Sequence, residues 1–122
     1  MQWTLDKSRP ICPQICEQIC VAIASGEFSA GEKLLSVREI ALLAGVNPNT
    51  VQKSFEELER RGVIHSVRCS GWYVNENVEG AVKEVHSIRE KKTEEYLAAM
   101  SQLGCRKEEI IKYLNDYLGG KP

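Results

Sequence analysis

The 122-residue sequence predicts a mainly α-helical fold with one small β-hairpin. Apolar residues recur at intervals of three and four through most of the chain, which places them on one face of a helix. Two short runs rich in β-branched and aromatic residues flank residues 69–71, where a tight turn can join them. A hydrophobic fraction of 43% is enough to build a buried core.

The first helix is expected from about Pro10 to Ser25. Its apolar stripe advances four residues at a time, through Ile11, Ile15, Ile19 and Ile23. Gly26 is well placed to end this helix, because glycine readily takes the left-handed conformation found after a helix C-terminus. Residues 27–35 then form a loop.

Two further helices follow, and each has an N-terminal capping signal. Ser36 and Glu39 have the spacing of a capping box, so the second helix should begin there. Asn47 can cap the third helix, and Pro48 suits its first position, where a missing N–H costs nothing. The third helix should run to about Gly62, with an apolar face formed by Val51, Phe55 and Leu58.

The hairpin should follow directly, with strands over residues 63–68 and 72–74 joined around Cys69, Ser70 and Gly71. Three helices and a hairpin can share one small core. A hairpin that follows a helix-turn-helix pair is a wing, so residues 1–75 are predicted to be a winged helix-turn-helix domain. Asn75-Glu-Asn77 breaks the apolar pattern and marks the expected boundary.

Residues 76–122 are predicted to form a two-helix tail, with a helix end near Gly104. Two amphipathic helices cannot enclose a core alone, so their apolar stripes need a partner. A second copy of the chain is the simplest partner, which makes the tail a dimerisation element. The residues expected to form the homodimer contact are Val82, Val85, Ile88, Tyr96, Met100, Ile110, Leu114, Tyr117 and Leu118.

The third helix has a polar first turn, which suggests a function. Asn49, Thr50 and Lys53 lie off its apolar face, near the end that carries partial positive charge and unpaired N–H groups. Such a turn suits the recognition helix of a helix-turn-helix, whose N-terminal residues meet base edges in the major groove of double-stranded DNA. The alternative is a capped surface helix without a ligand. The capping box upstream and the hairpin downstream favour DNA contact.

Charge and hydropathy limit the possible partners. The net charge is −1, and residues 1–75 carry eight Lys or Arg and eight Asp or Glu. Sequence-independent DNA affinity comes from neutralising phosphates, so binding would need local clustering of cations and two copies of the reader. No apolar run approaches the length that crosses a bilayer, and the start of the chain does not resemble a signal peptide. We therefore expect a cytoplasmic protein with no membrane contact.

The five cysteines include no C-x-x-C pair, so a disulfide framework is not expected. Cys12, Cys16 and Cys20 form a row on the first helix. We favour a role as small apolar residues; the alternative is a thiol- or metal-responsive regulator, for which they are weak candidate ligands. Cys105 precedes two cations at an expected helix start, which predicts a lowered thiol pKa, although a plain capping role is favoured.

Four motifs together resemble the GntR family of bacterial transcription regulators, and specifically its short YtrA-type branch. They are Pro10-Ile11-x-x-Gln14-Ile15, the block from Leu34 to Ala41, the string Gly45-Val-Asn-Pro-Asn-Thr-Val51, and Leu58-Glu-x-x-Gly62. The likeness covers about residues 3–75, and the tail matches in length and character. The resemblance implies dimers on palindromic operators, a short helical tail that dimerises, and target genes that often lie beside transporter genes.

The resemblance also implies DNA-binding residues. They are Ser36 and Arg38 at the second helix, Asn47, Pro48, Asn49, Thr50, Gln52 and Lys53 at the third, and Arg68, Ser70 and Gly71 in the wing. Three positions depart from the family pattern. Leu35 replaces a proline, Cys12 replaces an aromatic residue, and the wing reads Val67-Arg-Cys-Ser-Gly71 in place of Arg-x-Gly-Lys-Gly.

The sequence therefore predicts a homodimeric DNA-binding transcription regulator, a repressor on an inverted-repeat operator, with no cofactor. A protein-interaction adaptor is the alternative from a different class, slightly favoured by the near-zero charge and the weak wing. No nucleophile–base–acid arrangement, phosphate loop or metal cluster is visible, which argues against an enzyme. Nothing in the sequence identifies a small-molecule effector.

Overall fold

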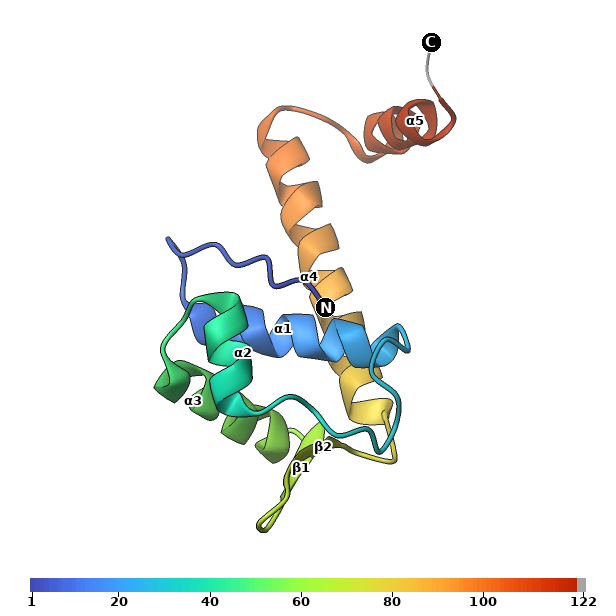
Figure 1. Ribbon diagram of the computed structural model, residues 1–122. Helices are drawn as coiled ribbons and strands as arrows, with labels where there is room; N and C mark the ends of the chain where they lie inside the picture. The colour runs from blue at the N-terminus through green and yellow to red at the C-terminus, as the bar shows by residue number, and fades with distance from the viewer. Residues whose placement is uncertain (121–122) are drawn as a thin grey trace. The chain divides into compact units, whose positions relative to one another are not determined.

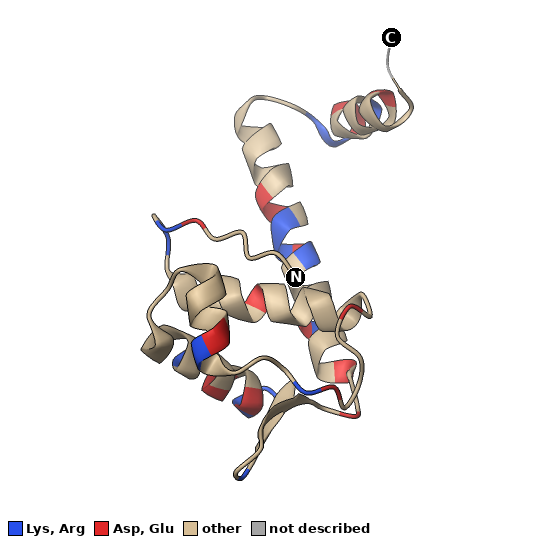
Figure 2. Cartoon of the chain, in the orientation of Figure 1, with Lys and Arg blue, Asp and Glu red and all other residues tan. Residues whose placement is uncertain are grey.

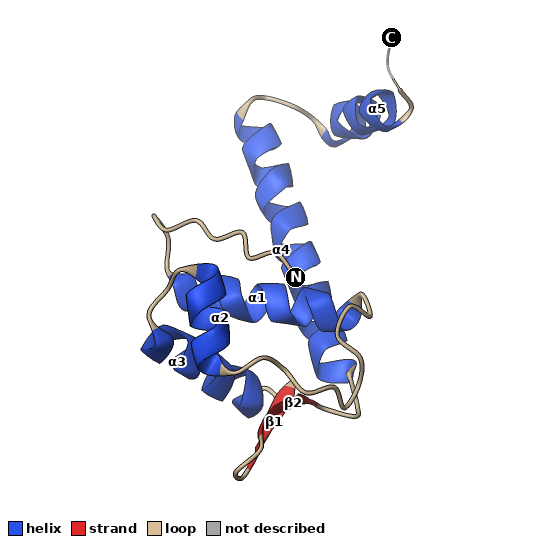
Figure 3. Cartoon of the chain, viewed as in Figure 1, coloured by secondary structure: helices blue, strands red, loops and turns tan. Residues whose placement is uncertain are grey.

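The computed structural model describes residues 1–120, and in that part of the chain it has five helices and one two-stranded sheet (Figure 1; Figure 3). In chain order the elements are α1 (Ile11–Ala24), α2 (Val37–Ala44), α3 (Pro48–Arg60), β1 (Ile64–Val67), β2 (Gly71–Val74), α4 (Glu79–Gln102) and α5 (Lys107–Leu118). The predicted mainly helical fold with a hairpin after a helix-turn-helix is confirmed. No helix among the described residues has the length and apolar character needed to span a membrane.

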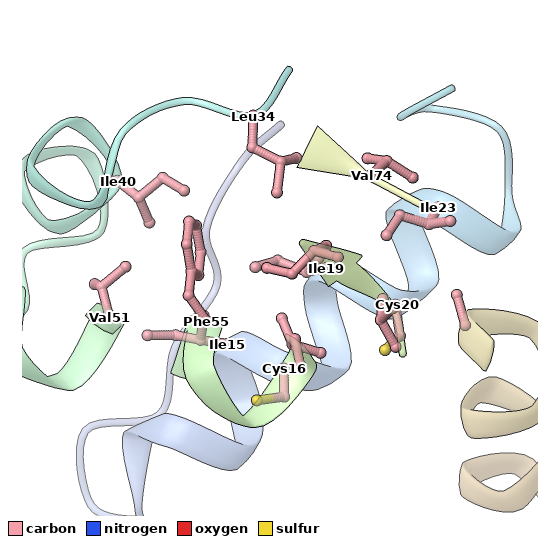
Figure 4. Packing of buried hydrophobic residues seen from close by; sticks show 14 of the residues in the cluster. Ile15, Cys16, Ile19, Cys20, Ile23, Leu34, Ile40, Val51, Phe55 and Val74 are labelled. Atoms are coloured by element: carbon pink, nitrogen blue, oxygen red, sulfur yellow. The ribbon is translucent and has the colours of Figure 1, made fainter. Parts of the chain in front are cut away.

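The chain divides into two compact units, Met1–His86 and a second that begins at Ser87, and α4 contributes to both. In the first unit, α3 packs against α1, α2 and β1. The stripe predicted on the first helix is buried at Ile15, Ile19 and Ile23, and Cys16 and Cys20 are buried beside it. Figure 4 shows Ile15 and Ile19 on the side of Val51 and Phe55 of α3, and Ile23 near Val74 of β2. The cysteine row therefore packs as part of the apolar core.

Two glutamines of α1 hold the N-terminal segment in place. The Gln14 side chain accepts from the Asp6 backbone N–H at 2.7 Å and donates to the Asp6 carbonyl at 2.9 Å. One helical turn on, Gln18 makes the same pair of contacts with the Thr4 backbone, at 3.3 and 2.6 Å. The two amides thus satisfy backbone groups much as a neighbouring strand would. This pairing keeps Trp3 and Leu5 packed on the core.

The hairpin is attached to the rest of the first unit along both of its strands. β1 and β2 pair antiparallel, with Ile64 opposite Val74 and Val67 opposite Gly71. On the β1 side, the Glu59 carboxylate of α3 accepts from the Ser66 backbone N–H at 3.0 Å. In the interior, Phe55 meets Trp72 edge to face with ring centroids 5.3 Å apart. The hairpin therefore holds a fixed position relative to α3.

The compact first unit extends past the boundary expected after Asn75. Residues 75–77 do form a loop, but the start of α4 packs into the core through Ala81 and Val85. A Cβ at Gly80 would lie 3.1 Å from the Gly62 carbonyl oxygen, so glycine permits this close approach. The unit ends at His86 because this first stretch of α4 is buried.

The second unit contains the rest of α4 and α5. Gly104, with φ of +79°, follows the end of α4 as predicted, and the Cys105 N–H donates to the Met100 carbonyl at 3.0 Å. Ile110 is buried within this unit. Most of its other large apolar side chains are exposed, namely Tyr96, Leu97, Leu103, Ile111, Tyr113, Leu114, Tyr117 and Leu118.

The tip of the hairpin gives a test of the fold. Cys69 has φ of +62°, and it is the only non-glycine residue with a positive φ among the described residues. This conformation costs a side chain about 1–2 kcal/mol, whereas glycine adopts it freely but loses about 0.5–1 kcal/mol of chain entropy. We therefore expect Cys69→Gly to raise the free energy of unfolding by about 0.5–1 kcal/mol in urea titrations.

Ser70→Gly is the matched control, because Ser70 has no positive φ and its hydroxyl hydrogen-bonds the Tyr73 hydroxyl. This variant should lower the free energy of unfolding. Equal effects of the two glycines would contradict the account of the turn.

Candidate nucleic-acid interface

The first turn of α3 is held by its cap. Asn47 is extended, with φ of −67° and ψ of 132°, and its side-chain oxygen accepts from the Asn49 backbone N–H at 2.8 Å. Pro48 occupies the first helical position as predicted. The side chains of Asn47, Asn49, Gln52 and Lys53 are exposed, and Thr50 is half-buried. The cap uses the Asn47 oxygen, so the amide nitrogen remains available as a donor.

The opposite face of α3 is fully buried. Val51, Phe55 and Leu58 each have no exposed surface. Ser54 is also buried, and its hydroxyl donates to the Thr50 carbonyl at 2.8 Å while its own carbonyl accepts from the Cys16 thiol at 3.5 Å. The N-terminal half of α3 is therefore fixed to α1 through both apolar contacts and one hydrogen bond.

The start of α2 is a complete capping box. The Ser36 hydroxyl accepts from the Glu39 N–H at 3.1 Å, and the Glu39 carboxylate accepts from the Ser36 N–H at 3.0 Å. Hydrogen bonds from the Ser36 backbone and from the Ser36 side chain both lower the pKa of Glu39, and the one from the backbone has the larger effect. Arg38 is exposed and forms no hydrogen bond or ion pair with any described residue. Ser36 and Arg38 were the two DNA-binding residues predicted at this helix. The Ser36 side chain is thus occupied by capping, whereas the Arg38 side chain is available to bind DNA.

The turn between α2 and α3 carries a cation that the sequence analysis did not identify. Gly45 adopts the left-handed conformation, with φ of 68° and ψ of 40°. The Lys7 ammonium donates to the Gly45 carbonyl at 3.0 Å. Lys7 is distant in sequence and lies in an irregular segment, so no periodicity pointed to it.

The predicted wing residues have different environments. Arg68 is exposed and has no ion pair within residues 1–120, and Figure 2 shows basic colouring at the hairpin tip. The Ser70 hydroxyl is occupied by Tyr73, whose ring stacks on His65 with centroids 6.1 Å apart. Gly71 is half-buried. Within this hairpin, Arg68 is therefore the group best suited to meet an anion.

Ion pairing divides the eight cations of residues 1–75 into two sets. Three are paired with carboxylates: Arg9 with Asp6 at 3.0 Å, Arg60 with Glu57, and Arg61 with Glu57 at 3.4 Å and with Glu84 at 3.2 Å. The other five form no ion pair with any described residue; they are Lys7, Lys33, Arg38, Lys53 and Arg68. Residues 1–75, which have no net formal charge, thus carry five unpaired cations on α2, α3 and the segments beside them.

The cysteines provide no evident metal site. Burial raises the pKa of Cys16 to about 12 and that of Cys20 to about 11. No cluster of three or more His, Cys, Asp or Glu in residues 1–120 could hold a metal ion. The expectation for Cys105 was wrong: partial burial, then the Glu109 charge, raises its pKa. Arg106, and not Cys105, is the N-cap of α5, and its guanidinium pairs with Glu109 at 3.0 Å.

A capped polar turn, a second capped helix, a hairpin and five unpaired cations define a winged helix-turn-helix protein of the DNA-binding class. Residues 13–74 match the family described as bacterial regulatory proteins, gntR family. The chain belongs to this family, as its sequence motifs predicted. It is therefore a DNA-binding transcription regulator and not an enzyme.

Relatives support the assignment along most of the chain. YhcF of Bacillus subtilis (strain 168), named an uncharacterized HTH-type transcriptional regulator, is 34% identical over 113 residues, covering 93% of each chain. The HTH-type transcriptional repressor YtrA of the same organism is 43% identical over 77 residues, covering 63% of this chain and 59% of YtrA. The similarity to YtrA agrees with the predicted short branch.

Two solved structures extend the comparison. A GntR family transcriptional regulator from Listeria monocytogenes has a TM-score of 0.82 and 39% identity, covering 92% of this chain and 98% of the other. The DNA-binding domain of AraR in complex with operator ORX1 has a TM-score of 0.52 and 25% identity, covering 61% of this chain and 90% of that domain. The tail is thus included in the likeness to the Listeria protein.

The capping box gives a pH-dependent prediction. Because the pKa of Glu39 is lowered in the folded chain, its charge stabilises the fold above the unfolded pKa of about 4.3, and this contribution is lost as pH falls through the lower folded value. The free energy of unfolding of Glu39→Gln should therefore lie below that of the wild type at neutral pH and converge with it in acid. Urea titrations from pH 7 to about 2.5 measure the difference.

Glu56→Gln is the control, because Glu56 is exposed on α3 and forms no hydrogen bond or ion pair with a described residue. The difference in free energy of unfolding between Glu56→Gln and the wild type should change less with pH. A pH-independent difference for Glu39→Gln would contradict the role of its charge.

Proposed function

We propose that this chain is a sequence-specific repressor that acts as a homodimer on an inverted-repeat operator. The observation that carries the proposal is the exposed polar first turn of α3, held by the Asn47 cap and backed by a fully buried face. Each subunit places this turn in a major groove, and the half-sites lie about one helical turn, ~34 Å, apart. Such a regulator acts in the cytoplasm, where it can meet chromosomal DNA.

The proposed reading face has distinct base and phosphate contacts. The Asn49 side chain forms no hydrogen bond with a described residue, so it can bind an adenine edge with two hydrogen bonds. Asn47, Thr50 and Gln52 flank it. Arg38, Lys53 and Arg68 supply phosphate contacts, which set affinity and register but not sequence. The five unpaired cations of residues 1–75 make this possible although that stretch as a whole is neutral.

The tail, residues 76–122, is proposed to hold the two copies together. Of the residues predicted for dimerisation, Tyr96, Leu114, Tyr117, Leu118 and Val82 are exposed, whereas Ile88 and Met100 are half-buried. Val85 and Ile110 are buried within their own units and leave almost no surface for a partner. The proposed contact therefore rests on the exposed residues, because exposed apolar surface of this extent favours association.

Repression and the target genes are proposed from the relatives and the family resemblance. YtrA, which matches the first unit at 43% identity, is named a repressor. A bound dimer at a promoter can exclude other proteins by occupying the site. Target genes beside transporters are proposed from the YtrA-type resemblance.

Base reading by Asn49 can be tested without disturbing the cap. Asn49→Ala keeps the backbone N–H that Asn47 accepts, so the stability of the fold should not change. A site is first selected from random duplexes with the wild type. The variant should then lose about 1–3 kcal/mol of preference for that site over a scrambled duplex, as measured by fluorescence anisotropy.

Gln102→Ala removes an exposed amide from the second unit and should leave the preference unchanged. Arg38→Ala should weaken binding to both duplexes alike, because phosphate contacts carry no sequence information. If Asn49→Ala discriminates as well as the wild type, the assigned reading face is incorrect.

Dimerisation is tested on the most exposed apolar residue of the tail. Leu118 is 85% exposed, so Leu118→Asp should not unfold the chain but should place a charge in the proposed contact. Sedimentation equilibrium at micromolar concentration should show the wild type as a dimer and the variant shifted toward monomer. Its affinity for the full inverted repeat should fall to near that for a half-site.

Leu42→Asp is the matched control, since Leu42 is 86% exposed but lies in the first unit. This change should leave the oligomeric state as it is. A wild-type monomer at micromolar concentration would overturn the proposed dimer.

A further inference from the structure

Lys33 lies in the loop between α1 and α2, and its backbone is fixed against the outer edge of the hairpin. The Leu34 N–H donates to the Trp72 carbonyl at 2.8 Å, and the Val74 N–H donates to the Glu32 carbonyl at 2.8 Å. The Lys33 backbone pairs with that of Tyr73 as an isolated antiparallel β-bridge. The loop thus extends the pairing of β2, so the Lys33 side chain starts from a well-defined position.

The side chain of Lys33 runs across Gly71. A Cβ at Gly71 would lie 3.2 Å from the Lys33 Cε and 4.0 Å from its Nζ, so the absence of a side chain at Gly71 makes room for the lysine. Lys33 is exposed and forms no ion pair with any residue in the described part of the chain. Its charge also acts on the Glu39 carboxyl at the start of α2. The ammonium therefore lies beside the wing and near the N-terminus of α2.

This position matters because the hairpin itself is poor in charge. Its tip contains Arg68 as its one cation, and Ser70 stands beside it with its hydroxyl bound to Tyr73. We propose that Lys33 is an additional DNA phosphate ligand, which supplies from the neighbouring loop the positive charge that the wing lacks. The inference rests on the proposed placement of α3 in the major groove, with the wing toward the adjacent minor groove.

A purely internal role for Lys33 is the alternative, namely neutralising Glu39. Two features weigh against it. The Glu39 carboxylate already accepts the Ser36 N–H at 3.0 Å within the capping box, so it does not depend on the lysine. Lys33 also approaches no carboxylate closely enough to form an ion pair among residues 1–120. An ammonium that is exposed, positioned and unpaired is suited to a phosphate.

The test is the salt dependence of binding to the selected duplex. Each phosphate contact contributes about 0.9 to the slope of log affinity against log salt. Lys33→Gln keeps most of the aliphatic chain and removes the charge, so it should reduce the slope by about one and the affinity by about fivefold at ~0.15 M salt. Preference over a scrambled duplex should not change. Lys33→Arg should restore the slope.

Two further variants separate the alternatives. Lys83→Gln removes an exposed cation of α4 and should leave the slope unchanged, which controls for net charge. In a Glu39→Gln background, Lys33→Gln should still reduce the slope by about one; no reduction there would mean that Lys33 acts only by neutralising Glu39. If the wild type binds and Lys33→Gln keeps the full slope, the Lys33 inference fails alone. If the wild type binds no duplex, the proposed function fails.

Discussion

The burial of one face of α3 is the constraint on which the rest of this protein depends. Val51, Phe55 and Leu58 are completely buried, and each such side chain contributes about 1.5–3 kcal/mol on leaving water. Because a helix repeats every 3.6 residues, burying this face turns Asn49, Gln52 and Lys53 outward. The packing that stabilises the first unit is thus also what presents its polar turn, so the two properties cannot be varied independently.

Charge pairing is the second organising feature. Residues 1–75 have no net formal charge, yet several of their carboxylates bind groups of the chain itself. Asp6 and Glu57 pair with arginines, Glu39 completes a cap, and Glu59 binds the hairpin. Arg38 of α2, Lys53 of α3 and Arg68 of the wing have no such partners among the described residues. Local potential depends on this distribution and not on the sum, so a neutral domain can still attract a polyanion locally.

Local signals in the sequence predicted most of the fold. The caps at Ser36 and Asn47 and the apolar stripes of α1 and α3 were sufficient, because each acts over one or two turns. The end of the first unit could not be predicted, since Ala81 and Val85 are buried by tertiary packing that a break after Asn75 does not reveal. The roles of Cys105 and Lys33 could not be predicted from local sequence signals either. The environment of each is set by residues that only the fold brings close.

One explanation accounts for both the small number of unpaired cations on the DNA-binding domain and the exposed apolar surface of the tail. Five phosphate contacts would give a salt slope of only about −4.5, which implies weak binding by one copy near physiological salt. Joining two copies makes the second binding event intramolecular, at an effective concentration of order millimolar. The proposed dimer would therefore gain affinity without a more basic surface, which would also increase binding to non-operator DNA. A DNA-binding domain with few unpaired cations, joined to a tail that associates, thus favours discrimination between DNA sequences over high affinity for all DNA.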